Sequence, residues 1–320
     1  MKPRLWWCTT RSPATPRPIL SPVLAALLSL ALLLAPGGTA WAGNLLIHDD
    51  NGQEVSLAEP ARRIIALYGA YNEILAGMGL TDRLVGRTKA DTQPPEILAK
   101  PSIGTHMRPN VEMILGLKPD LIIQNAGRQE NMPGLDQLRR QGAPVAVFHP
   151  TSFEDIFAVI QRLGVLTGCP DRAAALIEEM QGKLLAVAAR LQNVTERPKV
   201  FYEVRYPNLL GAGAGSIVNE VIVRAGGVNV VTVPKKIARM NLEAVIAGDP
   251  DAYIVQQGPM NPNPSPPAAR PHFGILRAVK TGRVLVVEER LFSRPSPGAA
   301  DAVVQLAAFL HPGLFPEARP

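Results

Sequence analysis

Asn110-Val-Glu-Met-Ile-Leu-Gly-Leu-Lys-Pro-Asp-Leu-Ile-Ile123 is a segment that occurs a second time, in diverged form, as Asn241-Leu-Glu-Ala-Val-Ile-Ala-Gly-Asp-Pro-Asp-Ala-Tyr-Ile254. Each copy starts with asparagine, a residue that favours the N-cap of a helix, and has a glutamate two positions later. A short apolar helix follows, and then Pro-Asp leads into a β-type run. Two such copies predict two lobes with the same helix-to-strand architecture.

Strands and helices alternate around both copies. This alternation is typical of a parallel sheet with helices on both faces, so we expect an α/β fold. Between the two halves, residues 171–192 form an Ala-rich helical pattern without proline, which at about 1.5 Å per residue would span roughly 30 Å and join two lobes. Residues 261–271 are rich in proline and predict an extended surface loop. The β-type runs are residues 63–67, 84–86, 121–123, 145–148, 199–204, 252–255 and 284–287.

The N-terminus has the layout of a secretory signal peptide. Four basic residues and no acidic residue accompany an apolar run at residues 19–35, and Ala40-Trp41-Ala42 supplies a small-x-small cleavage site. We therefore expect cleavage after Ala42 and a mature protein outside the cytoplasm that begins near Gly43. A transmembrane anchor is the alternative, but the run is short for a membrane span and Pro22 interrupts it.

Charge and cysteine content bear on three other properties. Without the four basic residues of the signal peptide, 29 of the 33 Lys and Arg remain against 27 Asp and Glu, a net charge of about +2. The basic pI therefore gives no support for nucleic-acid binding. Cys8 lies inside the signal peptide and no cysteine stands at its cleavage point, so no lipoprotein anchor is expected. Cys169 then remains alone, without an internal disulfide, and we expect a small, partly buried thiol at a helix boundary.

Further segments repeat the order found in a known family. They are Arg63-Ile-Ile-Ala-Leu-Tyr-Gly-Ala-Tyr-Asn-Glu-Ile-Leu75, Gly211-Ala-Gly-Ala-Gly-Ser216, Ala225-Gly-Gly-Val-Asn229, Ala278-Val-Lys-Thr-Gly-Arg-Val284 and Ser293-Arg-Pro-Ser-Pro297. Together with the two copies, they resemble the class III periplasmic substrate-binding proteins, which include the cobalamin, ferric-siderophore and haem receptors. Each segment alone is a weak match, but their number and order extend the resemblance over essentially the whole mature chain.

The resemblance implies two Rossmann-like lobes joined by a single long helix, with the ligand in the cleft between them. It also implies a partner, an inner-membrane ABC permease with its ATPase, and one acidic docking residue on each lobe, by position Glu112 and Glu243. Charges at the rim of an interface mainly set encounter rate and orientation, which suits transient docking. The expected organisation is signal peptide 1–42, N-terminal lobe 43–168, inter-lobe helix 169–195 and C-terminal lobe 196–320.

Ligand-binding residues are expected in loops that follow strand ends, where open α/β sheets bind ligands. Arginine, tyrosine and histidine dominate these loops. Guanidinium groups bind carboxylate or phosphate with paired hydrogen bonds, and tyrosines offer flat contact with a hydroxyl, so an anionic, partly flat ligand is expected. The expected ligand-binding residues are Tyr68, Tyr71, His106, Arg108, Arg128, Arg205, Tyr206, Arg239 and Arg294.

The expected ligand is a metal chelate, and first among the chelates a ferric siderophore. His106 and Arg128 lie where ferric-siderophore receptors that resemble this chain place ligand-contacting residues. Cobalamin receptors tend to have tryptophan near the first of these and aromatic residues on the facing lobe, where this chain has Leu210 and Ile237. Cobalamin, haem with an iron-ligating tyrosine or histidine, and a molybdate or tungstate oxyanion remain alternatives.

No resident cofactor is expected besides the cargo, which is an iron or other metal complex. The histidines are scattered, so no metal site made by protein side chains alone is expected. An enzyme is the main rival class, but the sequence has no G-x-S-x-G elbow and no suggestive nucleophile-base pair, so we expect a monomeric binding protein without catalytic residues. A sensory or scaffold domain that binds a membrane partner without transport is a third possibility.

Overall fold

The first half of the chain folds around a parallel four-stranded sheet. In this computed structural model, which describes residues 45–105, 108–126 and 133–316, the strand order is β4-β3-β7-β8. Side chains on both faces of these strands are buried and mostly apolar, as expected for a parallel sheet covered by helices. The strands are β3 (Ile64–Ala66), β4 (Leu84–Gly86), β7 (Leu121–Asn125) and β8 (Val145–Phe148), and the helices are α2 (Gly69–Gly77), α3 (Val111–Gly116), α4 (Pro133–Arg140) and α5 (Phe153–Thr167).

Two small antiparallel pairs and two 3-10 turns complete this lobe. β1 (Leu45–His48) pairs with β2 (Glu54–Leu57), and their alternate residues join the hydrophobic core. β5 (Gly104–Thr105) pairs with β6 (Arg108–Pro109). The 3-10 turns are η2 (Thr81–Arg83) and η3 (Pro95–Ala99).

The second half folds around a six-stranded mixed sheet. β13 (Ala252–Gln257) runs parallel to its neighbours β9 (Lys199–Arg205) and β14 (Val284–Glu288), and β11 (Val228–Asn229) also runs parallel to β9. β10 (Leu210–Ala212) is antiparallel to both β9 and β12 (Ile237–Arg239), an edge that the sequence pattern did not predict. The other elements are α7 (Ile217–Arg224), α8 (Leu242–Gly248), α9 (Arg277–Lys280), α10 (Glu289–Ser293), α11 (Gly298–Leu310), η5 (Pro267–Ala269) and η6 (Phe273–Ile275).

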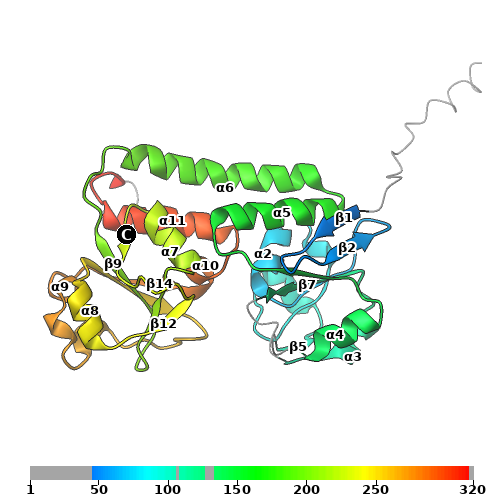
Figure 1. Ribbon diagram of the computed structural model, residues 1–320, viewed down its shortest axis with the longest axis horizontal. Coiled ribbons are helices and arrows are strands. Elements are labelled where there is room, and N and C mark those ends of the chain that lie inside the picture. The colour runs from blue at the N-terminus through cyan, green and yellow to red at the C-terminus, as the bar shows by residue number, and fades with distance from the viewer. Residues whose placement is uncertain (1–44, 106–107, 127–132, 317–320) are drawn as a thin grey trace, which may run out of the picture. The chain divides into compact units, whose positions relative to one another are not determined.

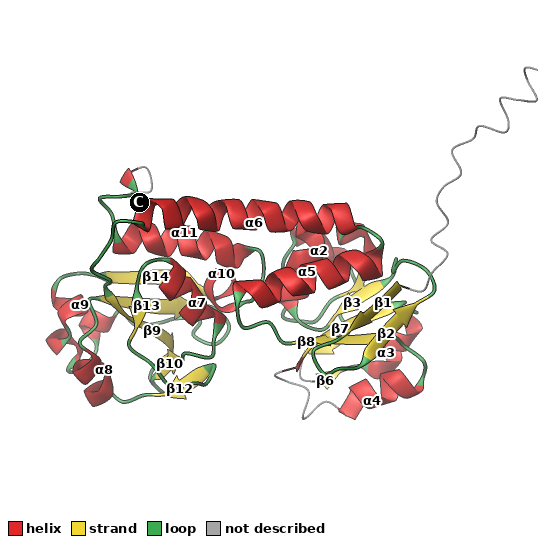
Figure 2. Ribbon diagram, turned by 45° about the horizontal axis from the view of Figure 1, so that its top comes forward, coloured by secondary structure: helices red, strands yellow, loops and turns green. Residues whose placement is uncertain are grey.

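A single long helix, α6 (Pro170–Leu191), packs on both lobes. It lies across α5 of the first lobe and α11 of the second, as Figures 1 and 2 show. Its buried face, which includes Leu176, Met180 and Leu184, belongs to one hydrophobic core that continues from the first sheet to the second. The predicted two-lobed α/β fold is therefore confirmed, and the shared core implies that the lobes resist wide separation.

The duplicated segments adopt the same local structure. Asn110 accepts a hydrogen bond from the Met113 amide (3.0 Å) at the start of α3, and Asn241 accepts one from the Ala244 amide (2.9 Å) at the start of α8. After each helix, a left-handed residue stands directly before the Pro-Asp pair: Lys118 (φ 47°) in one copy and Asp249 (φ 43°) in the other. The sequence repeat is thus a structural repeat, α3-β7 in one lobe and α8-β13 in the other.

The proline-rich segment 261–271 is mostly exposed, as expected for a surface loop, but it is anchored at buried residues. Arg270 is only 4% exposed and Asn261 only 3%. The Arg270 guanidinium forms a two-pronged ion pair with buried Glu203 of β9 and also lies over the Tyr206 ring, 4.0 Å from its centroid. The segment is therefore fixed into the second lobe by an internal charge that composition alone cannot reveal.

Three further expectations concern the N-terminus, a membrane-spanning helix and Cys169, and the one for Cys169 is confirmed. The expected signal peptide 1–42 lies outside the described residues. Among the helices that the structure describes, none has the length and apolar character needed to cross a membrane. Cys169 is partly buried at the N-cap of α6, with its Sγ 3.5 Å from an Arg83 nitrogen.

Candidate functional site

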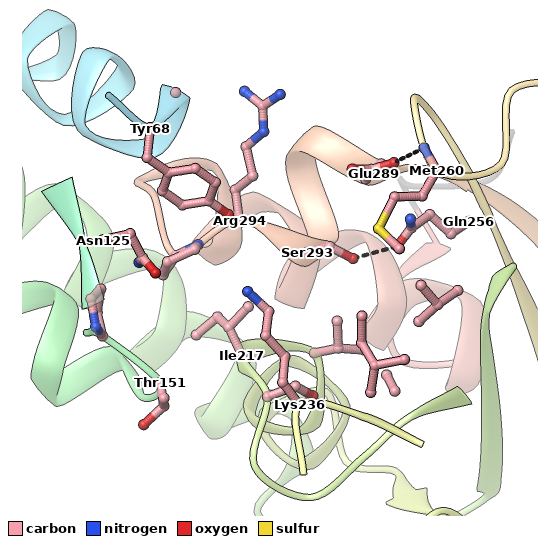
Figure 3. Close-up of a pocket in the computed structure, with 18 of the residues that line it drawn as sticks. Tyr68, Asn125, Thr151, Ile217, Lys236, Gln256, Met260, Glu289, Ser293 and Arg294 are labelled. Atoms are coloured by element: carbon pink, nitrogen blue, oxygen red, sulfur yellow. Dashed lines mark hydrogen bonds between the residues drawn. The ribbon is translucent and has the colours of Figure 1, made fainter. Parts of the chain in front are cut away.

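A cavity of about 410 Å³ lies between the two lobes. Its walls are formed largely where strands end, the position at which open α/β sheets bind ligands. Figure 3 shows Tyr68 and Asn125 on one side of it and Gln256 and Met260 on the other. The lining residues are Tyr68, Gly69, Thr88, Ala90, Asp91, Asn125, His149, Pro150 and Thr151 of the first lobe, and Val204, Ala212, Gly215, Ser216, Ile217, Val218, Lys236, Ile237, Gln256, Pro259, Met260, Glu289, Ser293, Arg294 and Pro295 of the second.

Arg294 reaches across from the second lobe to the start of α2. Its Nη1 donates to Glu73 Oε1 (3.0 Å), and the Ser296 hydroxyl donates to Glu73 Oε2 (2.8 Å). Burial raises the pKa of the Glu73 carboxyl, and the contacts with Ser296 and Arg294 oppose that rise. These hydrogen bonds join the lobes beside the cavity.

Gly69 makes room for this contact. A Cβ at position 69 would stand 2.7 Å from Arg294 Nη1 and 2.8 Å from Asp91 Oδ1. Asp91 is itself held by Thr88, whose amide and hydroxyl donate to its carboxylate at 3.1 and 2.8 Å. Burial raises the pKa of Asp91, and the Thr88 hydrogen bonds counter it. Glycine is therefore needed because two charged side chains pack directly on the backbone here.

Charge on the cavity wall is nearly balanced. Among the described lining residues, Lys236 and Arg294 are basic, Asp91 and Glu289 are acidic, and His149 is titratable. Most of the remaining wall is apolar, with Ile217 and Val218 at the start of α7 and Ile237 of β12, or carries neutral amides and hydroxyls. Such a wall suits a ligand with apolar surface and neutral polar groups better than a small, highly charged anion.

Two buried amide side chains face the cavity from opposite lobes. Asn125 ends β7 and is 6% exposed, and Gln256 lies near the end of β13 and is 1% exposed. Gln256 Oε1 accepts hydrogen bonds from Ser293 (2.6 Å) and from Tyr202 (3.3 Å). Buried amides in fixed orientations are typical of sites that read polar groups on a ligand.

The structure brings two of the nine sequence-predicted ligand residues to this cavity, Tyr68 and Arg294. Tyr71 lies instead in the core of the first lobe, where it is fully buried and its hydroxyl donates to the Phe148 carbonyl (3.1 Å). Tyr206 packs edge-on against Phe273 and beneath the Arg270 guanidinium. Neither tyrosine lines the cavity, and His106 and Arg128 lie outside the described residues.

Three predicted arginines are exposed away from the cavity: Arg108, Arg205 and Arg239. Side chains alternate along a strand, so Arg205 turns away where its neighbour Val204 faces the cavity. β12 pairs antiparallel with β10, which is itself antiparallel to β9, so β12 runs parallel to β9. The first residue of β12, Ile237, lines the cavity, and its last residue, Arg239, does not.

The amides, Lys236 and the hydroxyl residues of the wall were not predicted from the sequence. One signal was available for the amides. Asn125 and Gln256 are separated by the same number of residues as Asn110 and Asn241. If the two copies are extended to these positions, each ends in an amide side chain. No comparable pattern marks Lys236, which lies in an irregular stretch before β12.

Glu112 and Glu243 occupy equivalent positions in the first turns of α3 and α8. Both side chains are exposed. Since an asparagine side chain already caps each helix, neither glutamate is needed as a cap. Their role in docking stays a prediction.

Comparisons with known proteins agree with this architecture. Residues 64–291 match the family model described as periplasmic binding protein. The chain is 27% identical over 276 residues to an uncharacterized ABC transporter substrate-binding lipoprotein, YvrC, of Bacillus subtilis, which covers 85% of this chain and 87% of that protein. It is 27% identical over 261 residues to the vitamin B12-binding protein of Vibrio cholerae serotype O1, covering 78% and 90%.

A solved structure, a periplasmic heme-binding protein from Pseudomonas aeruginosa, is similar with a TM-score of 0.69 and 26% identity over 79% of this chain and 93% of that one. Two lobes, one bridging helix, a cavity between strand ends and a family match over most of the described residues all agree. The chain belongs to the periplasmic binding protein family and is the substrate-binding component of an ABC importer.

Proposed function

We propose that this protein captures a metal chelate in the periplasm and delivers it unchanged to an inner-membrane permease. The observation that carries the proposal is the cavity between the lobes, whose wall combines apolar side chains with neutral amides and hydroxyls. The described residues of the wall include no cysteine, and both acidic side chains accept hydrogen bonds from the protein. Asp91 accepts from the Thr88 hydroxyl, and Glu289 accepts from the Met260 amide (3.0 Å), so neither supports turnover of a ligand.

A corrinoid is the chelate that this wall supports best. Its macrocycle offers a broad apolar surface and its rim carries neutral carboxamides, which match Ile217, Ile237 and the amides of the wall. Vitamin B12-binding proteins among the relatives support the same choice. In this proposal, aliphatic side chains make the apolar contacts with the macrocycle that aromatic residues make in cobalamin receptors.

Two other chelates each have a supporting observation. Haem is supported by Tyr68, whose ring lies on the cavity wall and whose phenol is of a type that ligates haem iron, and by the heme-binding structure above. A ferric siderophore, the ligand expected from His106 and Arg128, depends on residues beyond the described ranges. An oxyanion is not supported, because Arg294 already pairs with Glu73 and acidic groups offset the basic ones.

Export and processing form part of the proposal. The arrangement of residues 1–42 supports a signal peptide cleaved after Ala42, so the working protein would begin at Gly43. The equivalent exposed positions of Glu112 and Glu243 support docking of one glutamate from each lobe on basic residues of the permease.

Titration of the purified mature protein tests the ligand. Calorimetry and absorption difference spectra follow the titration of four ligands: cyanocobalamin, haemin, ferric ferrioxamine and molybdate. We expect one cyanocobalamin to bind per chain with a dissociation constant of about 1 μM or lower, and no heat from molybdate. Tight binding of molybdate with none of the chelates would contradict the proposal, whereas preference for haemin or ferrioxamine would change only the chelate.

A further inference from the structure

Among the described residues that line the cavity, Gln256 has a buried side-chain atom without a hydrogen-bond partner. Its Oε1 accepts from Ser293 and Tyr202, but its Nε2 is buried and has no hydrogen-bond partner among the described residues. A buried amide nitrogen without a partner costs free energy, and native proteins leave few such groups. A cavity-lining residue with this deficit is suited to a partner that arrives with the ligand.

The surroundings of Gln256 hold its amide in place. Ser293 and Tyr202 lie within hydrogen-bond distance of each other as well as of Oε1, and the Asn261 side chain donates to the Gln256 carbonyl (2.9 Å). Burial raises the pKa of the Tyr202 phenol, which keeps its proton available for donation. Because hydroxyls can both donate and accept, the reversed amide would leave Oε1 without a partner instead, so one polar atom of Gln256 stays unpaired in either orientation.

The opposite wall has the equivalent residue of the repeat. Asn125 ends β7 as Gln256 nearly ends β13, and both line the cavity (Figure 3). Its Nδ2 lies 3.3 Å from the Tyr71 hydroxyl, to which it donates, so this amide is also fixed. The duplicated segment thus presents one ordered amide to the ligand from each lobe.

We propose that Gln256 donates a hydrogen bond from Nε2 to a carboxamide carbonyl at the edge of the bound chelate, with Asn125 facing it across the cavity. This inference rests on the proposed function and adds the chemical group that the site reads. A carboxamide satisfies the buried nitrogen without bringing a charge to the described wall, on which two basic and two acidic side chains balance. A carboxylate, as on haem, is the other acceptor that could lie here.

The test compares Gln256→Met, Gln256→Glu and the matched control Gln257→Met by titration with cyanocobalamin and with haemin. Met removes the donor at similar volume, and Glu replaces it with an acceptor while keeping the acceptor for Ser293 and Tyr202, so one variant remains informative if the other is unstable. Gln257 follows in the same strand, is exposed and does not line the cavity. Thermal unfolding checks that each variant is folded.

We expect both Gln256 variants to bind cyanocobalamin about tenfold more weakly than wild type and Gln257→Met to bind it equally well. Unchanged cyanocobalamin affinity in both folded Gln256 variants would overturn the inference and leave the proposed function standing. Dependence on Gln256 for haemin alone, with the larger loss in the Glu variant, would assign the acceptor to a carboxylate and also overturn it. Wild-type protein that binds neither chelate would instead count against the corrinoid and haem proposals themselves.

Discussion

Arg270→Ala is expected to lower the free energy of unfolding by about 3–5 kcal/mol, the range for a buried ion pair that loses one partner. Side-chain exposure is 1% for Arg270 and 0% for Glu203, so the remaining carboxylate would have no access to water. The Tyr253 hydroxyl also donates to Glu203, and it cannot compensate for the lost positive charge. Chemical denaturation monitored by circular dichroism measures the loss.

Arg277→Ala is the matched control on the same lobe. Arg277 pairs with Asp249 (2.6 Å) and Asp251 (2.8 Å), but its side chain is 48% exposed. Water can solvate the groups left behind, so this change is expected to cost less than about 1 kcal/mol. Equal, small losses for Arg270→Ala and Arg277→Ala would contradict the assignment of Arg270 as the internal anchor of segment 261–271.

The loss at Arg270 should also reach the ligand site. Arg270 fixes the end of segment 261–271 by its ion pair with Glu203. Its Nε and Nη2 also donate to the Ser265 carbonyl, at 2.9 and 2.6 Å. The beginning of the segment follows Pro259 and Met260, which line the cavity. The ion pair therefore connects the stability of the second lobe to the shape of the cavity wall.

Reversing both Glu112 and Glu243 to Lys is expected to abolish ligand uptake while ligand affinity stays nearly unchanged. Each glutamate is exposed and absent from the cavity wall, so the substitution does not touch the ligand. If basic residues of the permease meet these positions, two like-charge contacts replace two attractive ones, and uptake should fall by more than about tenfold. Transport of labelled ligand into cells lacking the native protein gives the rate, and titration gives the affinity.

Glu178→Lys combined with Glu196→Lys is the control for this experiment. Both residues are exposed, one on α6 and one in the segment that follows it, and the change in net charge is the same. This control should transport at the wild-type rate. An equal loss of uptake in both double variants would show a general charge effect, and an equal loss of affinity in the Glu112/Glu243 variant would contradict a docking role.

The sequence predicted the features of this fold that depend on local patterns. The two copies, each with an asparagine cap and a Pro-Asp stop, predicted the repeated helix and strand. The proline-free pattern at 171–192 predicted α6, which runs from Pro170 to Leu191. Caps, breakers and helical periodicity act over a few residues, so they can be read directly from the chain. Strand direction at the edge β10-β12 depends on long-range pairing and was not predicted.

The site was harder to predict because tertiary neighbours decide which side chains face the cavity. Arg294 was predicted at the cavity, but its ion pair with Glu73, which is 221 residues earlier in the chain, was not. Tyr71 was expected at the ligand because it follows a strand end, yet α2 turns it toward Phe148 in the core. Of the expected arginines that the structure describes, Arg108, Arg205 and Arg239 are exposed away from the cavity, and the described wall carries neutral amides.

Native mass spectrometry of the protein recovered from its host's periplasm, together with its absorption spectrum, tests the central claim most directly. We expect a chain that begins at Gly43, carrying one metal-containing chelate that leaves intact on denaturation and that shows the bands of a corrinoid. A chain recovered with a metal-free ligand such as a sugar or an amino acid, or one that takes up no metal chelate when the panel is supplied, would contradict the account.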